Sequence, residues 1–140
     1  MPAGHKKKKT LVRAKATARI RQTDRTELSE RKLIEAAIKL LVTTGIHNTT
    51  LEEVGLLAGY SRGLSTYRFG SKPGLFARVL TMASNDWMSR VQAAVGNRVG
   101  SDALIAATDA AHAFIRDRTD HVRAMYLLWF LSKIRAIVSL

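Results

Sequence analysis

The sequence predicts an all-α protein, because three kinds of helix signal recur along it. Apolar residues repeat with the helical period in several segments, residues that favour helix starts precede them, and glycines stand where a helix would end. The 140 residues suit one domain, or one small domain and part of another. Hydrophobic residues form 46% of the chain and aromatic residues only 6%, so we expect a mainly aliphatic core.

The charge of the chain indicates a polyanionic partner. Its 23 Lys and Arg residues outnumber its 11 Asp and Glu residues, which gives a formal net charge of +12. Nucleic acid is the commonest partner of so basic a protein, and an anionic membrane or a ribosome-type RNA surface is the alternative. The absence of cysteine excludes disulfides, thiol chemistry and cysteine–zinc sites, and it fits a reducing cytoplasm.

A membrane location is not expected. The basic start of the chain has no apolar segment behind it, so it does not resemble a signal peptide. The longest apolar run, Ala124–Leu131, has eight residues and is too short to cross a bilayer. We therefore expect a cytoplasmic protein.

Half of the net charge lies at the start of the chain. Residues 1–30 hold nine Lys or Arg residues and three acidic ones, a net charge of +6. Because residues 1–25 show little apolar periodicity, we expect them to form a disordered basic arm. Such an arm contacts phosphates or the minor groove of DNA, or it is simply a solubilising tail.

The folded part is expected to begin with a helix over residues 27–44. Thr26 or Ser29 would cap its start, and Gly45 would end it. Its apolar residues form one amphipathic stripe: Leu33, Ile34, Ala37, Ile38, Leu41 and Val42.

Two short helices should follow, separated by a glycine turn. Thr50 and Glu53 have the spacing of a capping box at the start of the first, and Gly59 would supply the turn at its end. The second should start after Ser61, as an N-cap, and run to Phe69. A short helix, a glycine turn and a short basic helix are typical of a helix-turn-helix, whose second helix enters the major groove.

A long helix should come next, starting after Ser71 with Pro73 in its first turn. We therefore expect three parts: the arm over residues 1–25, a three-helix DNA-binding domain over residues 26–74 and a partial helical regulatory domain over residues 75–140. The fold class is then all-α, with a helix-turn-helix domain followed by an incomplete helical ligand and dimerisation domain.

Residues 49–75, "TTLEEVGLLAGYSRGLSTYRFGSKPGL", preceded by "AAIKLLVTTG", resemble the DNA-binding domain of the TetR family of bacterial transcriptional regulators. The resemblance covers about residues 31–80. The positions that match the family pattern in register are Ala58, Gly59, Ser61, Gly63, Phe69, Ser71 and Lys72. The chain departs from that pattern at Thr66, where an aromatic residue is usual, at Gly55 in the second helix, and at Pro73-Gly74, where an acidic residue is often found.

The resemblance implies DNA contacts at particular positions. Arg62, Gly63 and Leu64 would face base edges, with Arg62 pairing with guanine and Leu64 touching a thymine methyl. Phosphate contacts would come from Tyr67, Arg68 and Lys72, with a short hydroxyl contact from Thr66, and from the start of the second helix at Thr49 and Thr50.

Other interpretations of these residues stay open. Tyr67 can pack under the turn, Arg62 can be a solvated helix-start residue, and Lys72 can be ordinary surface charge. Phe69 is expected in the core.

The resemblance also implies a small-molecule inducer and a homodimer formed by the last two helices of the family's second domain. The chain ends at Leu140, before those helices, so a normal homodimer is doubtful, and a fragment, a truncated reading frame or a short variant are all possible. We expect Met125, Trp129 and Phe130 to belong to the core; in a complete family member they could instead line the inducer cavity or an adjoining surface, and in this chain they could be partly exposed.

No enzyme or cofactor is expected. Asp109, His112 and His121 are the nearest approach to a metal site, but no third ligand has a convincing spacing, so they are interpreted as a solvated helix face. No Ser/His/Asp arrangement or phosphate-binding glycine loop is present. The leading hypothesis is a sequence-specific transcription regulator, most often a repressor relieved by a small molecule. The alternatives are a nonspecific basic nucleic-acid-binding protein and a remnant that only pairs with a homologue.

Overall fold

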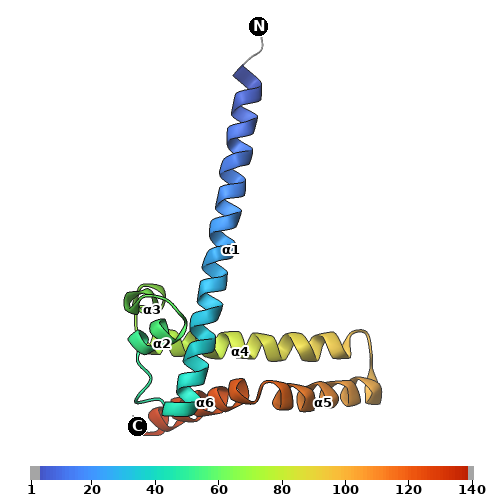
Figure 1. Cartoon of the computed structure of the whole chain (residues 1–140). Helices are drawn as coiled ribbons and strands as arrows, with labels where there is room; N and C mark the ends of the chain where they lie inside the picture. Colours follow the sequence, from blue (N-terminus) through green and yellow to red (C-terminus); the bar gives the residue numbers. More distant parts are fainter. Residues whose placement is uncertain (1–3, 139–140) are drawn as a thin grey trace. The chain divides into compact units, whose positions relative to one another are not determined.

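The computed structural model describes the backbone of residues 4–138 and the side chains of residues 18 and 20–133. Over this range it consists of helices without strands, so the predicted all-α class is confirmed (Figure 1). The helices are α1 (Gly4–Thr44), α2 (Leu51–Leu57), α3 (Arg62–Phe69), α4 (Lys72–Val95), α5 (Gly100–Asp117) and α6 (Thr119–Val138). The chain divides into two units, Met1–Lys32 and Leu33–Leu140.

The first unit is the N-terminal part of α1, where the structure differs from the expected disordered arm. Residues 4–25 are helical, and the predicted helix start at Thr26 or Ser29 is wrong, because the Ser29 hydroxyl donates to the Thr26 carbonyl at 2.8 Å inside the helix. Lys, Arg and Ala are strong helix formers, and no Gly or Pro interrupts residues 5–44, so the helix can continue without an apolar stripe. The predicted end is confirmed, since Gly45 follows α1 with a φ of +83°.

The second unit has one apolar core to which four helices contribute. Residues 33–41 of α1 supply most of it, α2 adds Val54, α4 adds Leu75 and Val79, and α6 adds Ala124 and Leu128. This cluster has members on both sides of the boundary expected between residues 74 and 75, and the division into domains stays a prediction. The α2–α3 pair lies at the N-terminal end of α4 (Figure 1).

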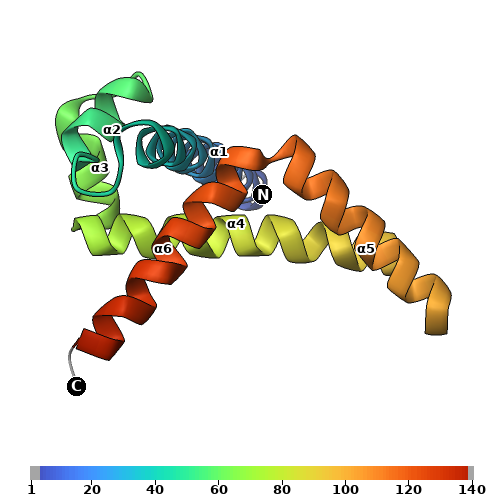
Figure 2. The same ribbon diagram turned by 90° about the horizontal axis from the view of Figure 1, so that it is seen from below.

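The other helices of this unit pack along α4. After a turn at residues 96–99, α5 returns beside the C-terminal half of α4, and α6 then crosses α4 obliquely (Figure 2). The Trp87 ring of α4 meets the Phe114 ring of α5 edge to face, with centroids 5.3 Å apart. Among the described residues, no helix combines the length and the apolar character needed to span a bilayer.

The helix signals at α2, α3 and α4 are mostly confirmed. The Thr50 hydroxyl accepts from the Glu53 amide at 3.2 Å, while a Glu53 carboxylate oxygen accepts from the Thr50 amide at 3.3 Å, so the predicted capping box is present. The Ser71 hydroxyl accepts from the Gly74 amide at 3.2 Å. Ser61 occupies the N-cap position of α3 but makes no side-chain capping bond.

Candidate nucleic-acid interface and helical pocket

The turn between α2 and α3 is held by backbone hydrogen bonds. The Tyr60 amide donates to the Gly55 carbonyl at 2.9 Å, and the Gly59 amide donates to the Leu56 carbonyl at 3.0 Å. Gly59 has a φ of +81°, a conformation that glycine adopts without steric cost. These bonds fix the direction in which α3 leaves α2.

Gly55 sets how closely α2 and α3 approach. A Cβ atom at this position would lie 2.6 Å from the Ser61 carbonyl oxygen and 3.4 Å from the Ser65 hydroxyl. Ser65, on the inner side of α3, is fully buried. The glycine that departs from the family pattern is therefore required by the close helix crossing, which compensates for its low helix propensity.

The outer face of α3 is exposed and carries polar groups. Arg62, Gly63, Thr66 and Tyr67 are all exposed, and they share one side of the helix because they are spaced three or four residues apart. Tyr67 is 83% exposed, so its ring does not pack under the turn. This face therefore presents the guanidinium of Arg62, the hydroxyl of Thr66 and the phenol of Tyr67 around Gly63, which has no side chain.

The charge around this face is of one sign. No Asp or Glu occurs between residues 54 and 85, whereas Arg62, Arg68, Lys72 and Arg78 all lie in that interval. Carboxylates would repel a phosphate backbone, so their absence suits a surface that meets DNA. Glu52 and Glu53 precede the interval, in the first turn of α2.

The two threonines at the start of α2 are placed differently from the expectation. Thr49 is fully buried, and its hydroxyl donates to the Gly45 carbonyl at 2.8 Å, so its side chain cannot reach DNA in this conformation. Thr50 is exposed, but its amide and hydroxyl are both engaged by Glu53 in the capping box. The Glu53 carboxylate thus competes with a phosphate for the Thr50 amide and hydroxyl.

The remaining predicted contact residues are only partly exposed. Leu64 packs against the core, as Phe69 does in agreement with the prediction. Arg68 is half-buried. The Lys72 ammonium donates to the His47 carbonyl at 3.0 Å and lies 5.7 Å from the centre of the Phe76 ring, which ties the start of α4 to the loop after α1.

A second feature is a pocket of about 520 Å³ among α4, α5 and α6. It lies within the usual size range of small-molecule sites. No Asp, Glu, Lys, Arg or His lines it, and Ser84 and Tyr126 supply its hydroxyl groups. Its other walls are apolar: Leu80, Trp87, Phe114, Ile115, Val122, Met125 and Trp129.

Sequence reasoning considered a pocket at residues 125–130 only as the alternative to a core position. Met125 and Trp129 line it, and the expectation that Trp129 and Phe130 are core residues is wrong, since they are 55% and 61% exposed. A continuous apolar run does not reveal which of its faces is covered by other helices.

The three residues that came nearest to a metal site in the sequence, Asp109, His112 and His121, do not lie together. Asp109 and His112 are exposed on α5, whereas His121 of α6 is buried and its Nε2 lies 3.1 Å from a Glu35 carboxylate oxygen. The interpretation of His121 as part of a solvated face is therefore wrong, because α1 covers it. Over the part of the chain that the structure describes, no group of three or more His, Cys, Asp or Glu residues is arranged to hold a metal.

Comparison with known families identifies the same segment. Residues 33–79 match the family described as "Bacterial regulatory proteins, tetR family". The match starts at the first core residue of α1, covers α2 and α3, and ends at Val79 of α4. No curated protein matches the chain significantly. The matched segment, residues 33–79, is therefore similar to the helix-turn-helix DNA-binding domain of the TetR family of bacterial regulatory proteins.

Proposed function

We propose that the protein is a sequence-specific transcription regulator, acting as a repressor that a small molecule releases from DNA. The observation that carries the proposal is the exposed, acid-free outer face of α3. Its family binds DNA through the helix-turn-helix domain found here. A helix that presents donors and no carboxylates is suited to the major groove.

The proposed base contacts lie at the start of α3. Arg62 would donate two hydrogen bonds to a guanine, and Gly63 would let the helix backbone come close to the base edges. Added to Gly63, a Cβ atom would meet nothing within 4 Å, so the fold itself does not require glycine there. Leu64 is proposed as a minor contact, since it is half-buried.

The proposed phosphate contacts flank this start. Thr66 and Tyr67 are exposed on the same face, and Arg68 and Lys72 add positive charge at its edge. Such contacts position the helix on DNA without reading sequence. Thr49 is not part of the proposed set, because it is buried, and Thr50 is left with its capping role.

The proposed effector site is the pocket among α4, α5 and α6. Its aromatic walls and its lack of ionisable Asp, Glu, Lys, Arg and His favour an uncharged, largely apolar ligand. A charged ligand would lose its hydration there without gaining an ion pair.

Selection of bound fragments from random-sequence DNA tests the proposal. We expect one motif to be enriched, and a palindromic motif would indicate that two copies bind together. The Arg62→Ala variant should lose roughly 1–3 kcal/mol on that motif and relax the preference at one base position. No enrichment, or an equal loss on random DNA, would contradict sequence-specific reading by α3.

A nonspecific nucleic-acid-binding protein is the second candidate, because residues 1–30 carry half of the net charge. Competition separates the two functions. Specific binding persists in excess random DNA at moderate salt, whereas binding by the basic segment alone is competed away.

A further inference from the structure

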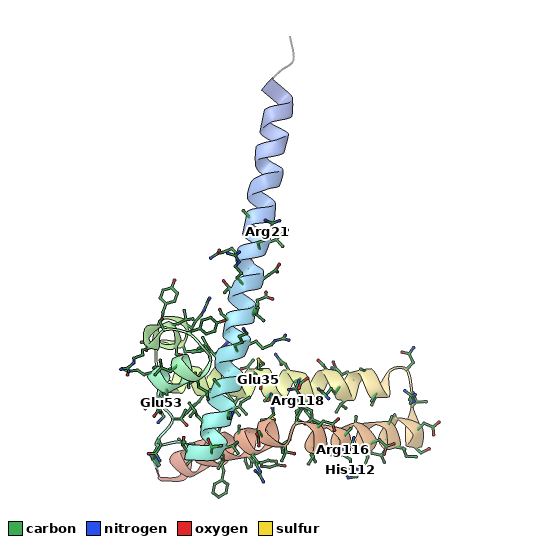
Figure 3. The ribbon with its side chains drawn as sticks, in the orientation of Figure 1. Arg21, Glu35, Glu53, His112, Arg116 and Arg118 are labelled. Carbon is green, nitrogen blue, oxygen red and sulfur yellow. The ribbon has the colours of Figure 1, made fainter. Side chains whose placement is uncertain are left out.

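Four charged or titratable side chains from different parts of the second unit meet at one place. The Arg118 guanidinium lies 3.8 Å from Glu35 and 3.6 Å from Asp86, and His121 Nε2 lies 3.1 Å from Glu35. Glu35 belongs to α1, Asp86 to α4 and His121 to α6, while Arg118 joins α5 to α6. Figure 3 shows Glu35 and Arg118 at this meeting point of the helices. We call these four residues the ionic cluster.

The ionic cluster is directly connected to the walls of the pocket. The Arg118 amide donates to the carbonyl of Phe114 at 2.8 Å, and the amide of Val122 donates to the Arg118 carbonyl at 3.0 Å. Phe114 and Val122 both line the pocket. Asp86 directly precedes the wall residue Trp87, and His121 directly precedes Val122. A shift of these walls therefore moves Asp86, Arg118 and His121.

Arg90 adds a further connection on α4. Its guanidinium pairs with Asp86 at 3.1 Å and lies 5.6 Å from the centre of the Phe114 ring. That ring also meets Trp87 edge to face. A ligand that separates Trp87 from Phe114 would therefore also displace Arg90, which pairs with Asp86.

On its other side the ionic cluster reaches the DNA-binding domain through Glu35. The neighbours of Glu35 in α1, Ile34 and Ala36, are buried in the core that also holds Val54 of α2 and Leu75 of α4. Packed interiors transmit displacement because they contain little free volume. A change in the position of Glu35 is thus passed to the helices that support α3.

Half-exposed ion pairs contribute little to the free energy of folding. Stabilisation alone therefore does not explain well why four such residues meet in the ionic cluster. The Glu35, Arg118 and Asp86 side chains are 44%, 38% and 31% exposed, whereas His121 is 8% exposed. We infer that the ionic cluster couples the pocket to the DNA-binding domain, with Glu35 as the residue through which α1 responds. This inference rests on the proposed function of the pocket as an effector site.

Coupling between two sites is measurable in both directions, because it is a shared free energy. The test uses the full chain, the DNA motif recovered by selection and the neutral fluorophore N-phenyl-1-naphthylamine as the pocket probe. DNA affinity is measured with and without saturating probe, and probe affinity with and without DNA. The variants are Glu35→Gln and Arg118→Gln, and Arg116→Gln is the matched control, since Arg116 is 76% exposed and pairs with Asp117 outside the cluster.

In the wild-type chain and in Arg116→Gln, we expect saturating probe to weaken DNA binding at least about fivefold. In Glu35→Gln and Arg118→Gln the effect should fall below about twofold, while each ligand alone binds with nearly unchanged affinity. Arg118→Gln keeps the test valid if Glu35→Gln folds poorly, because it leaves the contact between Glu35 and the buried His121 in place.

The two possible failures differ. Coupling that persists in both cluster variants overturns the inference and leaves the effector pocket intact. Absence of coupling in the wild-type chain overturns the inference together with the proposed effector role of the pocket.

Discussion

Gly55 and Gly63 lie eight residues apart on the two helices of the helix-turn-helix, but their surroundings give them opposite roles. A methyl group on Gly55 would approach the Ser61 carbonyl to 2.6 Å, whereas one on Gly63 would meet nothing within 4 Å of protein. Glycine at position 55 is thus explained by packing. Position 63 faces outward on α3, so packing does not require glycine there, which is compatible with the DNA contact proposed for it.

The two alanine variants should therefore behave differently. Gly55→Ala should lower the free energy of unfolding by about 1–3 kcal/mol through overpacking. Gly63→Ala should raise it by up to about 1 kcal/mol through helix propensity, yet weaken DNA binding. Urea denaturation and DNA titration measure the two effects. Normal DNA affinity in Gly63→Ala would show that α3 does not bring this residue close to the bases.

Lys72 has a structural partner that the sequence did not predict. Because its ammonium donates to the His47 carbonyl, Lys72→Met should lower the free energy of unfolding by about 0.5–1.5 kcal/mol. If Lys72 also contacts a phosphate, the slope of log affinity against log salt should fall by about one. Unfolding in urea and DNA titration across salt concentrations separate these roles. An unchanged unfolding free energy would contradict the structural role.

At the scale of helices, the sequence predicted correctly those helix ends that depend on interactions between nearby residues. The capping box at Thr50 and Glu53, the positive φ of Gly59 and the cap at Ser71 depend on residues within one turn, and all are present. The helix start at Thr26 or Ser29 failed, because a cap residue also fits inside a helix when its hydroxyl bonds back to a carbonyl.

The parts of the candidate sites that sequence reasoning missed are long-range. His121 meets Glu35 across 86 positions of the chain, and no periodicity on either helix reports that contact. The exposed face of α3 was predictable because the helix is short and lies between the glycine turns at Gly59 and Gly70.

The basic segment of α1 lies outside the core, which begins at Leu33. Deletion of residues 1–25 removes nine basic residues and one acidic residue. We expect it to weaken binding to random DNA and to reduce its salt dependence, with little change in the thermal midpoint, because released counterions supply such affinity. Thermal unfolding and DNA titration measure this. A change in the selected motif would instead mean that the segment reads sequence.

At the scale of the whole molecule, the core of the second unit extends beyond the family match. The match ends at residue 79, but Ala124 and Leu128 of α6 are buried in the same cluster as the α1, α2 and α4 residues. The core of the matched segment is therefore completed by a helix that lies outside the match. A common core is also the physical requirement for transmitting an effector signal to α3.

This shared core predicts that α6 and the matched segment unfold together. Leu128 is 6% exposed, so Leu128→Ala should lower the free energy of unfolding by about 2–5 kcal/mol. Amide hydrogen exchange should then accelerate in residues 33–41 of α1 as well as in α6, because both sides of the cavity lose protection. The neighbouring Leu127, 41% exposed, provides the control, since its truncation should have a much smaller effect. Faster exchange confined to α6, with α1 still protected, would show that the matched segment is stable by itself and that α6 only rests on it.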